Sequence, residues 1–221
     1  MWWRNENVMT TIMPFESYLD ETNRAVWFSL NTPFEIQTYL DSLPYKHEDL
    51  DRCPLRVMED RQCHCLDGGM LAAAALRRIG YAPLLLDLVP AAGMDDDHVL
   101  AVFKVNDKYG AVAKSNFPGL RFREPVYRSL RELAMSYFEV FFNVDGVKTL
   151  RGYSRPFNLS AFDRYGWETT QAGAEKAVRK FYSLRPIPLI SEAEAAALHR
   201  LDQRSYDANT LGTNFNELYD G

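Results

Sequence analysis

The sequence has little that would point to nucleic acid or to a membrane. Its 25 Lys and Arg are outnumbered by 30 Asp and Glu, which gives a net charge of -5. Proteins that bind nucleic acid or anionic lipid usually cluster basic residues instead. Apolar runs such as Ala72–Leu76 are far too short to span a bilayer. We therefore expect no nucleic-acid partner and no membrane partner.

Cysteine, targeting signals and linkers are also scarce. There are three cysteines, an odd count, and Cys63 and Cys65 are too close in sequence for an easy disulfide. Residues 1–10 contain two tryptophans but no basic segment followed by a long apolar stretch. The chain shows no repeat and no Gly/Ser linker. These features predict reduced thiols, a cytoplasmic location and one continuous unit with a sizeable core.

The residues that are present predict a mixed helix and strand content. Helices are expected where capping residues precede apolar periodicity, and strands where short apolar runs lie between turn residues. The predicted helices cover residues 33–43, 66–80, 124–146 and 172–182, with one more from Ser191, where Glu194 has capping-box spacing. A buried strand is predicted over residues 82–90, and a hairpin over 98–105 and 109–115.

Cys65 immediately precedes the clearest helix of the sequence. A thiol attacks amide carbonyls as the thiolate, and the unpaired N–H groups of a helix N-terminus favour that anion. Gly68 and Gly69 follow in the first turn, where each costs about 1 kcal/mol relative to alanine. Their presence indicates that another group approaches this turn closely, either a ligand or a packed backbone. Cys65 is therefore a candidate nucleophile, and a small core residue is the structural alternative.

A nucleophilic cysteine needs a base, and His98 opens the first strand of the predicted hairpin. A third group should orient the imidazole from the neighbouring strand. The hairpin places residues 113–116 across from His98, so Asn116 is the first choice for this role and Ser115 the second. The candidate catalytic residues are thus Cys65, His98 and Asn116.

These motifs together resemble the core of the transglutaminase-like superfamily. The resemblance is carried by the run CLDGGML from Cys65, by LRRIGY from Leu76 and by His98 at the start of a strand. It covers about residues 60–125 and is similar to bacterial-type members. The family implies a papain-like α+β fold, with the cysteine-bearing helix packed on an antiparallel sheet. It also implies a catalytic core over residues 1–160, followed by a helical extension over 161–221.

The resemblance implies a cysteine-dependent amide-bond hydrolase or acyltransferase. Cys65 would form an acyl-enzyme with a peptide or protein amide, and no cofactor or metal would take part. Hydrolysis is favoured over amine transfer because nothing marks a dedicated amine site. Family members usually carry an aspartate on the strand after the histidine, whereas this chain has GAVAKSN after Tyr109. The alternative is therefore a weak or inactive scaffold used for binding.

Two neighbouring patterns allow other interpretations. Cys63, His64 and Cys65 contain zinc-binding groups, but structural zinc ligands are usually spaced by two or more residues, so we do not expect a metal here. The run Asp95–Asp97 is typical of a solvated loop. Its functional alternative is a negative potential that raises the pKa of His98 or attracts a cationic amine.

Overall fold

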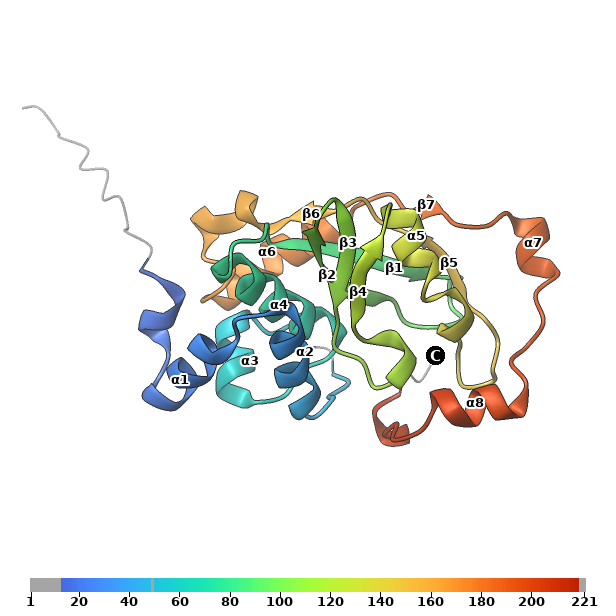
Figure 1. The fold of residues 1–221 in the computed structure, drawn as a ribbon, viewed down its shortest axis with the longest axis horizontal. Helices are drawn as coiled ribbons and strands as arrows, with labels where there is room; N and C mark the ends of the chain where they lie inside the picture. Colours follow the sequence, from blue (N-terminus) through green and yellow to red (C-terminus); the bar gives the residue numbers. More distant parts are fainter. Residues whose placement is uncertain (1–12, 49, 219–221) are drawn as a thin grey trace, which may run out of the picture.

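The computed structural model describes residues 13–48 and 50–218, so residues 1–10, with their two tryptophans, lie outside it. An antiparallel sheet crosses the middle of the molecule, with α1–α4 gathered at one end and α7 and α8 towards the other (Figure 1). The α-helices are α1 (Glu21–Ser29), α2 (Pro33–Ser42), α3 (Pro54–Asp60), α4 (Cys65–Arg78), α5 (Leu130–Met135), α6 (Gln171–Phe181), α7 (Glu192–Ala196) and α8 (Gln203–Asn209). The strands are β1 (Leu84–Pro90), β2 (His98–Val105), β3 (Lys108–Val112), β4 (Arg123–Tyr127), β5 (Leu150–Tyr153), β6 (Phe157–Asn158) and β7 (Ile187–Pro188).

The strands follow the order β4-β3-β2-β1-β5-β7, and β6 also pairs with β1. Every pairing is antiparallel. The predicted α+β class, with a cysteine-bearing helix packed on an antiparallel sheet, is therefore confirmed. The predicted hairpin is also confirmed, and its turn residues Asn106 and Asp107 both have positive φ. Two consecutive positive φ values are typical of a tight hairpin turn.

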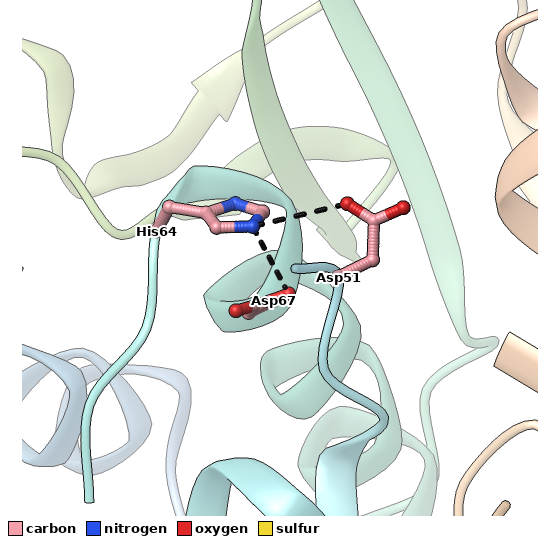
Figure 2. Close-up of side chains that lie close together, drawn as sticks. All are labelled: Asp51, His64 and Asp67. Carbon is pink, nitrogen blue, oxygen red and sulfur yellow. Dashed lines mark ion pairs between the residues drawn. The ribbon is translucent and has the colours of Figure 1, made fainter. Parts of the chain in front are cut away.

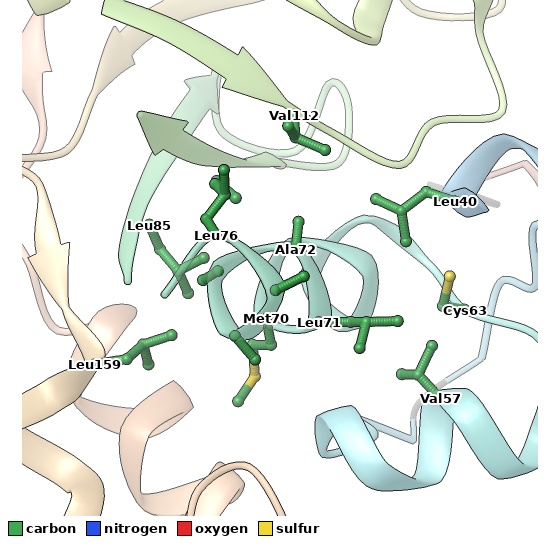
Figure 3. Packing of buried hydrophobic residues seen from close by; sticks show 14 of the residues in the cluster. Leu40, Val57, Cys63, Met70, Leu71, Ala72, Leu76, Leu85, Val112 and Leu159 are labelled. Atoms are coloured by element: carbon green, nitrogen blue, oxygen red, sulfur yellow. The ribbon is translucent and has the colours of Figure 1, made fainter. Parts of the chain in front are cut away.

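Helix α4 lies at the centre of the larger hydrophobic core (Figure 3). Its residues from Cys65 to Leu76 are all buried, which agrees with the prediction from its apolar sequence. One face of β2 packs against it through Val99 and Ala101. Arg77 and Arg78 occupy the last turn, where cations interact favourably with the helix dipole. The sequence thus directs α4 into the middle of the fold.

A second core covers the opposite face of the sheet. Leu100 and Val102 alternate with the α4-facing residues of β2 and pack here with aromatic residues from the segment after β4. The predicted continuous helix over residues 124–146 is wrong. Residues 123–127 form β4, because they alternate in burial and include Pro125, and the Ser129 side chain then caps α5.

Residues after 160 contribute to both cores. Trp167 and Phe181 are buried in the α4 core, and β7 pairs with β5. The predicted helix near residues 172–182 is confirmed as α6, and the predicted capping box of Ser191 and Glu194 is present at α7. The division into a core of residues 1–160 and an extension stays a prediction. Across the described residues, each helix is too short or too polar to cross a bilayer.

Candidate functional site

Cys65 is the first residue of α4, and its side chain reaches a cavity of about 330 Å³. The sulfur lies 3.7 Å from the backbone carbonyl oxygen of Asp97, to which the thiol donates a hydrogen bond. The residue is only 7% exposed. Asp96, Asp97 and Tyr182 line the same cavity. The predicted position of the cysteine at a helix N-terminus is thus confirmed, and acidic groups surround it.

The two glycines after Cys65 allow the sheet to approach the first turn of α4. A Cβ atom on Gly68 would lie 2.4 Å from the Cβ of Lys114, and one on Gly69 would lie 2.9 Å from Cγ1 of Val99. The close approach that the sequence predicted is therefore made by strand and loop side chains. This close packing holds the N-terminus of α4, and with it Cys65, next to β2.

His98 lies on the other face of the sheet. Val99 points towards α4, so the preceding residue of the strand points away from it. The His98 Nε2 atom lies 2.6 Å from the carbonyl oxygen of Leu120, and the ring contacts Tyr137 and Phe141 in the second core. Burial lowers the pKa of His98 to about 4. The alternative in which the acidic run raises this pKa does not hold, because desolvation dominates.

Asn116 is engaged with the C-terminal segment. Its amide nitrogen donates to the carbonyl oxygens of Asn214 and Glu217, at 2.9 Å and 3.3 Å, and its Oδ1 accepts the Asn214 backbone N–H at 2.9 Å. Ser115 accepts the backbone N–H of Phe117 through its Oγ. His98 and Asn116 line a neighbouring cavity of about 340 Å³ that does not include Cys65. The structure therefore does not bring the three predicted catalytic residues together.

The acidic side chains beside Cys65 form a connected group. Asp87 comes from β1 opposite Val99 and is hydrogen-bonded to the carboxyl group of Asp97. The Tyr182 hydroxyl, at the end of α6, donates to Asp97 Oδ2 at 3.1 Å. Burial, followed by the charge of Asp97, raises the pKa of Asp87, and burial, followed by the charge of Asp96, raises the pKa of Asp97. The hydrogen bond between the two carboxyl groups raises the pKa of Asp87 further and lowers that of Asp97, so a shared proton favours Asp87.

These surroundings disfavour a free thiolate. Burial, followed by the charges of Asp97 and Asp96, raises the pKa of the Cys65 thiol well above its ordinary value, although the Val99 backbone N–H lowers it. The run Asp95–Asp97 is half-buried rather than a solvated loop. The helix N-terminus alone therefore does not activate this thiol. For Cys65 to act as a nucleophile, the thiol proton would have to be transferred to a base while the sulfur attacks the carbonyl carbon.

A second polar group lies beside the first turn of α4 (Figure 2). His64 Nε2 lies 3.4 Å from Asp67 and 3.8 Å from Asp51, and the ligand atoms of the three residues all fall within 4.8 Å of one another. In the described part of the chain, this is the one group of His, Cys and acidic side chains with a spacing that could hold a metal ion. The guanidinium of Arg52 already lies 3.6 Å from Asp67 Oδ2.

Arg52 explains why Asp67 is tolerated with no exposed surface. The Asp67 carboxylate accepts the Arg52 backbone N–H at 2.6 Å, and burial raises its pKa to about 8. This aspartate supports the loop before α3 rather than facing the Cys65 cavity. Cys63 is fully buried in the α4 core, and all three cysteines are free. Reduced thiols were predicted from their number and spacing.

Asp87 and Tyr182 are not among the site residues predicted from the sequence, and the prediction places Asp97 in a solvated loop. One signal was available, because Asp87 is a lone acid inside the apolar run LLLDLVP. A charged residue within a buried strand requires a partner or a shifted pKa, and either is typical of functional sites. Tyr182 had no comparable signal, since it follows an ordinary amphipathic helix and reaches the site only through the packing of α6.

No family model matches the sequence, and no curated protein matches it. Among solved structures, the chain is similar to two of Legionella pneumophila LapG, one of them of the EGTA-treated protein, each at 11% identity and a TM-score of 0.35. These matches cover 45% of this chain and 66% of the other. The calcium-bound form of LapG gives 12% identity, the same TM-score, and coverages of 46% and 67%. The chain thus spans about two thirds of the length of these structures.

Proposed function

We propose that this chain is a transglutaminase-like, cysteine-dependent amide-bond hydrolase that acts through an acyl-enzyme on Cys65. The observation that carries the proposal is the position of the thiol. It belongs to the first residue of a 14-residue buried helix and faces a cavity beside acid and hydroxyl groups. The family resemblance of the motif CLDGGML and the order of the elements around it support the same activity.

The chemistry requires a bound amide whose carbonyl carbon lies next to the Cys65 sulfur. The first backbone N–H groups of α4 have no partner within the helix and can stabilise the oxyanion that forms on attack. The cavity wall includes Glu48, Asp51, Asp96 and Asp97, which favours substrates with a positive charge near the scissile bond. We therefore expect peptides with Lys or Arg beside this bond to be preferred.

The alternative is a binding scaffold that keeps Cys65 for packing. It is favoured by one specific observation, namely that His98 and Asn116 do not reach the thiol, while the pKa of the thiol is raised. In such a protein the acidic cavity would bind a cationic peptide without cleaving it. The two functions differ in whether a substrate is turned over at Cys65.

The test is a screen of fluorogenic peptidyl-coumarin amides with each residue type in turn before the scissile bond. Wild-type protein should release coumarin, Cys65→Ala should not, and Cys65→Ser should lose at least about a hundredfold in rate. After acid quench, the intact-mass spectrum should show a thioester on Cys65, as an increase in the protein mass that matches the peptidyl acyl group. Equal rates for wild type and Cys65→Ala, or no release from any amide, would favour the scaffold instead.

A further inference from the structure

We propose that Asp97, backed by Asp87 and Tyr182, takes the place of an imidazole and exchanges the proton with Cys65. This inference rests on the proposed function, since it names the group that handles the proton in the same site. It assigns His98 a structural role in the second core. Asp97 and Cys65 share the face of the sheet that α4 covers, and His98 does not.

Strand alternation places the carboxyl group of Asp97 on the side of Cys65. Val99 packs on Gly69 of α4, and Asp97 lies two residues earlier, hence on the same side of the sheet. The thiol already contacts the backbone of Asp97 at 3.7 Å, and both side chains line one cavity. His98, one residue later, necessarily faces the other way, where Leu120 accepts its hydrogen bond.

The hydrogen bonds around Asp97 prepare its carboxylate to accept and return a proton. The Tyr182 hydroxyl donates to it from the end of α6, and Asp87 on β1 shares a hydrogen bond with it. Asp87 is nine-tenths buried, and within residues 13–48 and 50–218 its Oδ1 has no hydrogen-bond partner. A buried carboxyl group without a partner for one oxygen is costly in a purely structural role. The titratable groups that interact with Asp97 are Tyr45, Cys65, Asp87, Asp96 and Tyr182, and the same cavity is also lined by His47, Glu48, Asp51 and His64.

The reaction balances with these groups and water. As the Cys65 sulfur bonds to the amide carbon, its proton passes to Asp97 and the carbonyl π pair moves to the oxygen. The oxyanion then reforms the carbonyl, the C–N bond breaks, and Asp97 returns the proton to the leaving amine. Water next adds to the thioester carbon while Asp97 takes one of its protons. The C–S bond breaks, and that proton goes back to the sulfur, which leaves a carboxylic acid and the free thiol.

The experiment compares Asp97→Asn with two imidazole variants, His98→Gln and His47→Gln, and with the matched control Asp96→Asn. Two readouts are taken on each full-length protein: coumarin release from a lysyl amide, and the rate of iodoacetamide alkylation at each cysteine by mass spectrometry. His47 is included because it lines the same cavity as Cys65, whereas the other histidine of this cavity, His64, has its Nε2 paired with Asp67 and Asp51. Cys53 and Cys63 are fully buried and report on unfolding.

Asp97→Asn should lower the turnover number by about a hundredfold or more, because a general base is lost. It should also raise Cys65 alkylation about tenfold at pH 7, because an anion beside the thiol is removed. Cys53 and Cys63 should stay unlabelled. A fall in turnover together with a rise in Cys65 alkylation distinguishes a proton acceptor from a packing residue. Loss of a packing residue would expose all three cysteines to alkylation, or would change neither turnover nor alkylation.

Other outcomes separate the two proposals. If wild type turns over the amide but only His98→Gln or His47→Gln abolishes this, the role of Asp97 is overturned while the hydrolase stands. If no protein turns over the amide, the proposed hydrolase fails, and with it the catalytic role of Asp97, whatever the alkylation shows. A fall in turnover for Asp96→Asn equal to that for Asp97→Asn would also overturn the inference, since it would reflect general charge.

Discussion

Cys65 and His98 are separated by the sheet: the thiol touches the backbone of Asp97, and the next residue directs its imidazole into the opposite core. The thiol therefore contacts the residue next to His98, yet Cys65 and His98 do not form a dyad in this arrangement. The same alternation of side chains that directs His98 away from the thiol places Asp97 beside it. This relationship governs the site and leads to a prediction about the stability of the protein.

Acid should destabilise the protein through His98. Its folded pKa is about 4, below the ordinary value of 6.5, so the unfolded state binds a proton first as the pH falls. The stability contributed by the neutral ring is complete above about pH 6.5 and declines towards pH 4, by about 3 kcal/mol.

Urea unfolding of wild type and His98→Gln at pH 7 and pH 4 measures this effect. The variant should be less stable at pH 7 by about 1 to 3 kcal/mol, because the Leu120 carbonyl loses a well-placed donor. At pH 4 the two proteins should nearly coincide. A stability difference that stays constant between these pH values would show that the buried imidazole does not titrate as proposed.

Gly68→Ala should destabilise the protein by about 2 kcal/mol, although alanine is the better helix former by about 1 kcal/mol. The reason is the 2.4 Å approach of Lys114 Cβ to the position of the new methyl group. Lys114 cannot withdraw easily, since its ammonium donates to the carbonyl oxygens of Leu40 and Leu43. Thermal and urea unfolding measure the change.

Gly69→Ala is the matched control for this substitution. Its methyl group would lie 2.9 Å from a terminal methyl group of Val99, which can move more readily than a Cβ atom. We expect a smaller loss of stability than for Gly68→Ala. Equal stability of Gly68→Ala and wild type would mean that α4 does not pack against this segment as closely as described.

Asn116→Ala should release the C-terminal segment without changing Cys65. The amide of Asn116 exchanges two hydrogen bonds with the backbone of Asn214 and donates a third to Glu217. Hydrogen–deuterium exchange should show loss of protection over residues 213–217, while alkylation of Cys65 stays within about twofold of wild type. Ser115→Ala is the control, because Ser115 bonds only within its own loop among the contacts described.

A large drop in turnover for Asn116→Ala, with protection over residues 213–217 unchanged, would contradict this assignment. It would restore the catalytic role that the sequence suggested for Asn116. The proposed hydrolase would then depend on a rearrangement that brings Asn116 towards the thiol.

Local patterns in the sequence predicted several elements and placed Cys65 at the N-terminus of a helix. Periodicity and capping predicted α2, α4, α6 and the hairpin, because these signals act over a few neighbouring residues. The glycines after Cys65 predicted a close approach, which the structure shows. The helix predicted over residues 124–146 is wrong, because closely spaced aromatic residues are as compatible with β4 and the short helices after it as with one long helix.

The residues that surround Cys65 depend on tertiary packing, which the sequence pattern does not reveal. A shift of one residue in a strand moves a side chain to the other face, so a histidine that opens a strand does not reveal which core it enters. The choice between Asp97 and His98 depends on how β2 packs against α4, with Val99 on Gly69. Asp87 and Tyr182 come from β1 and α6 and meet Asp97 only because the antiparallel sheet and its covering helix bring distant segments together.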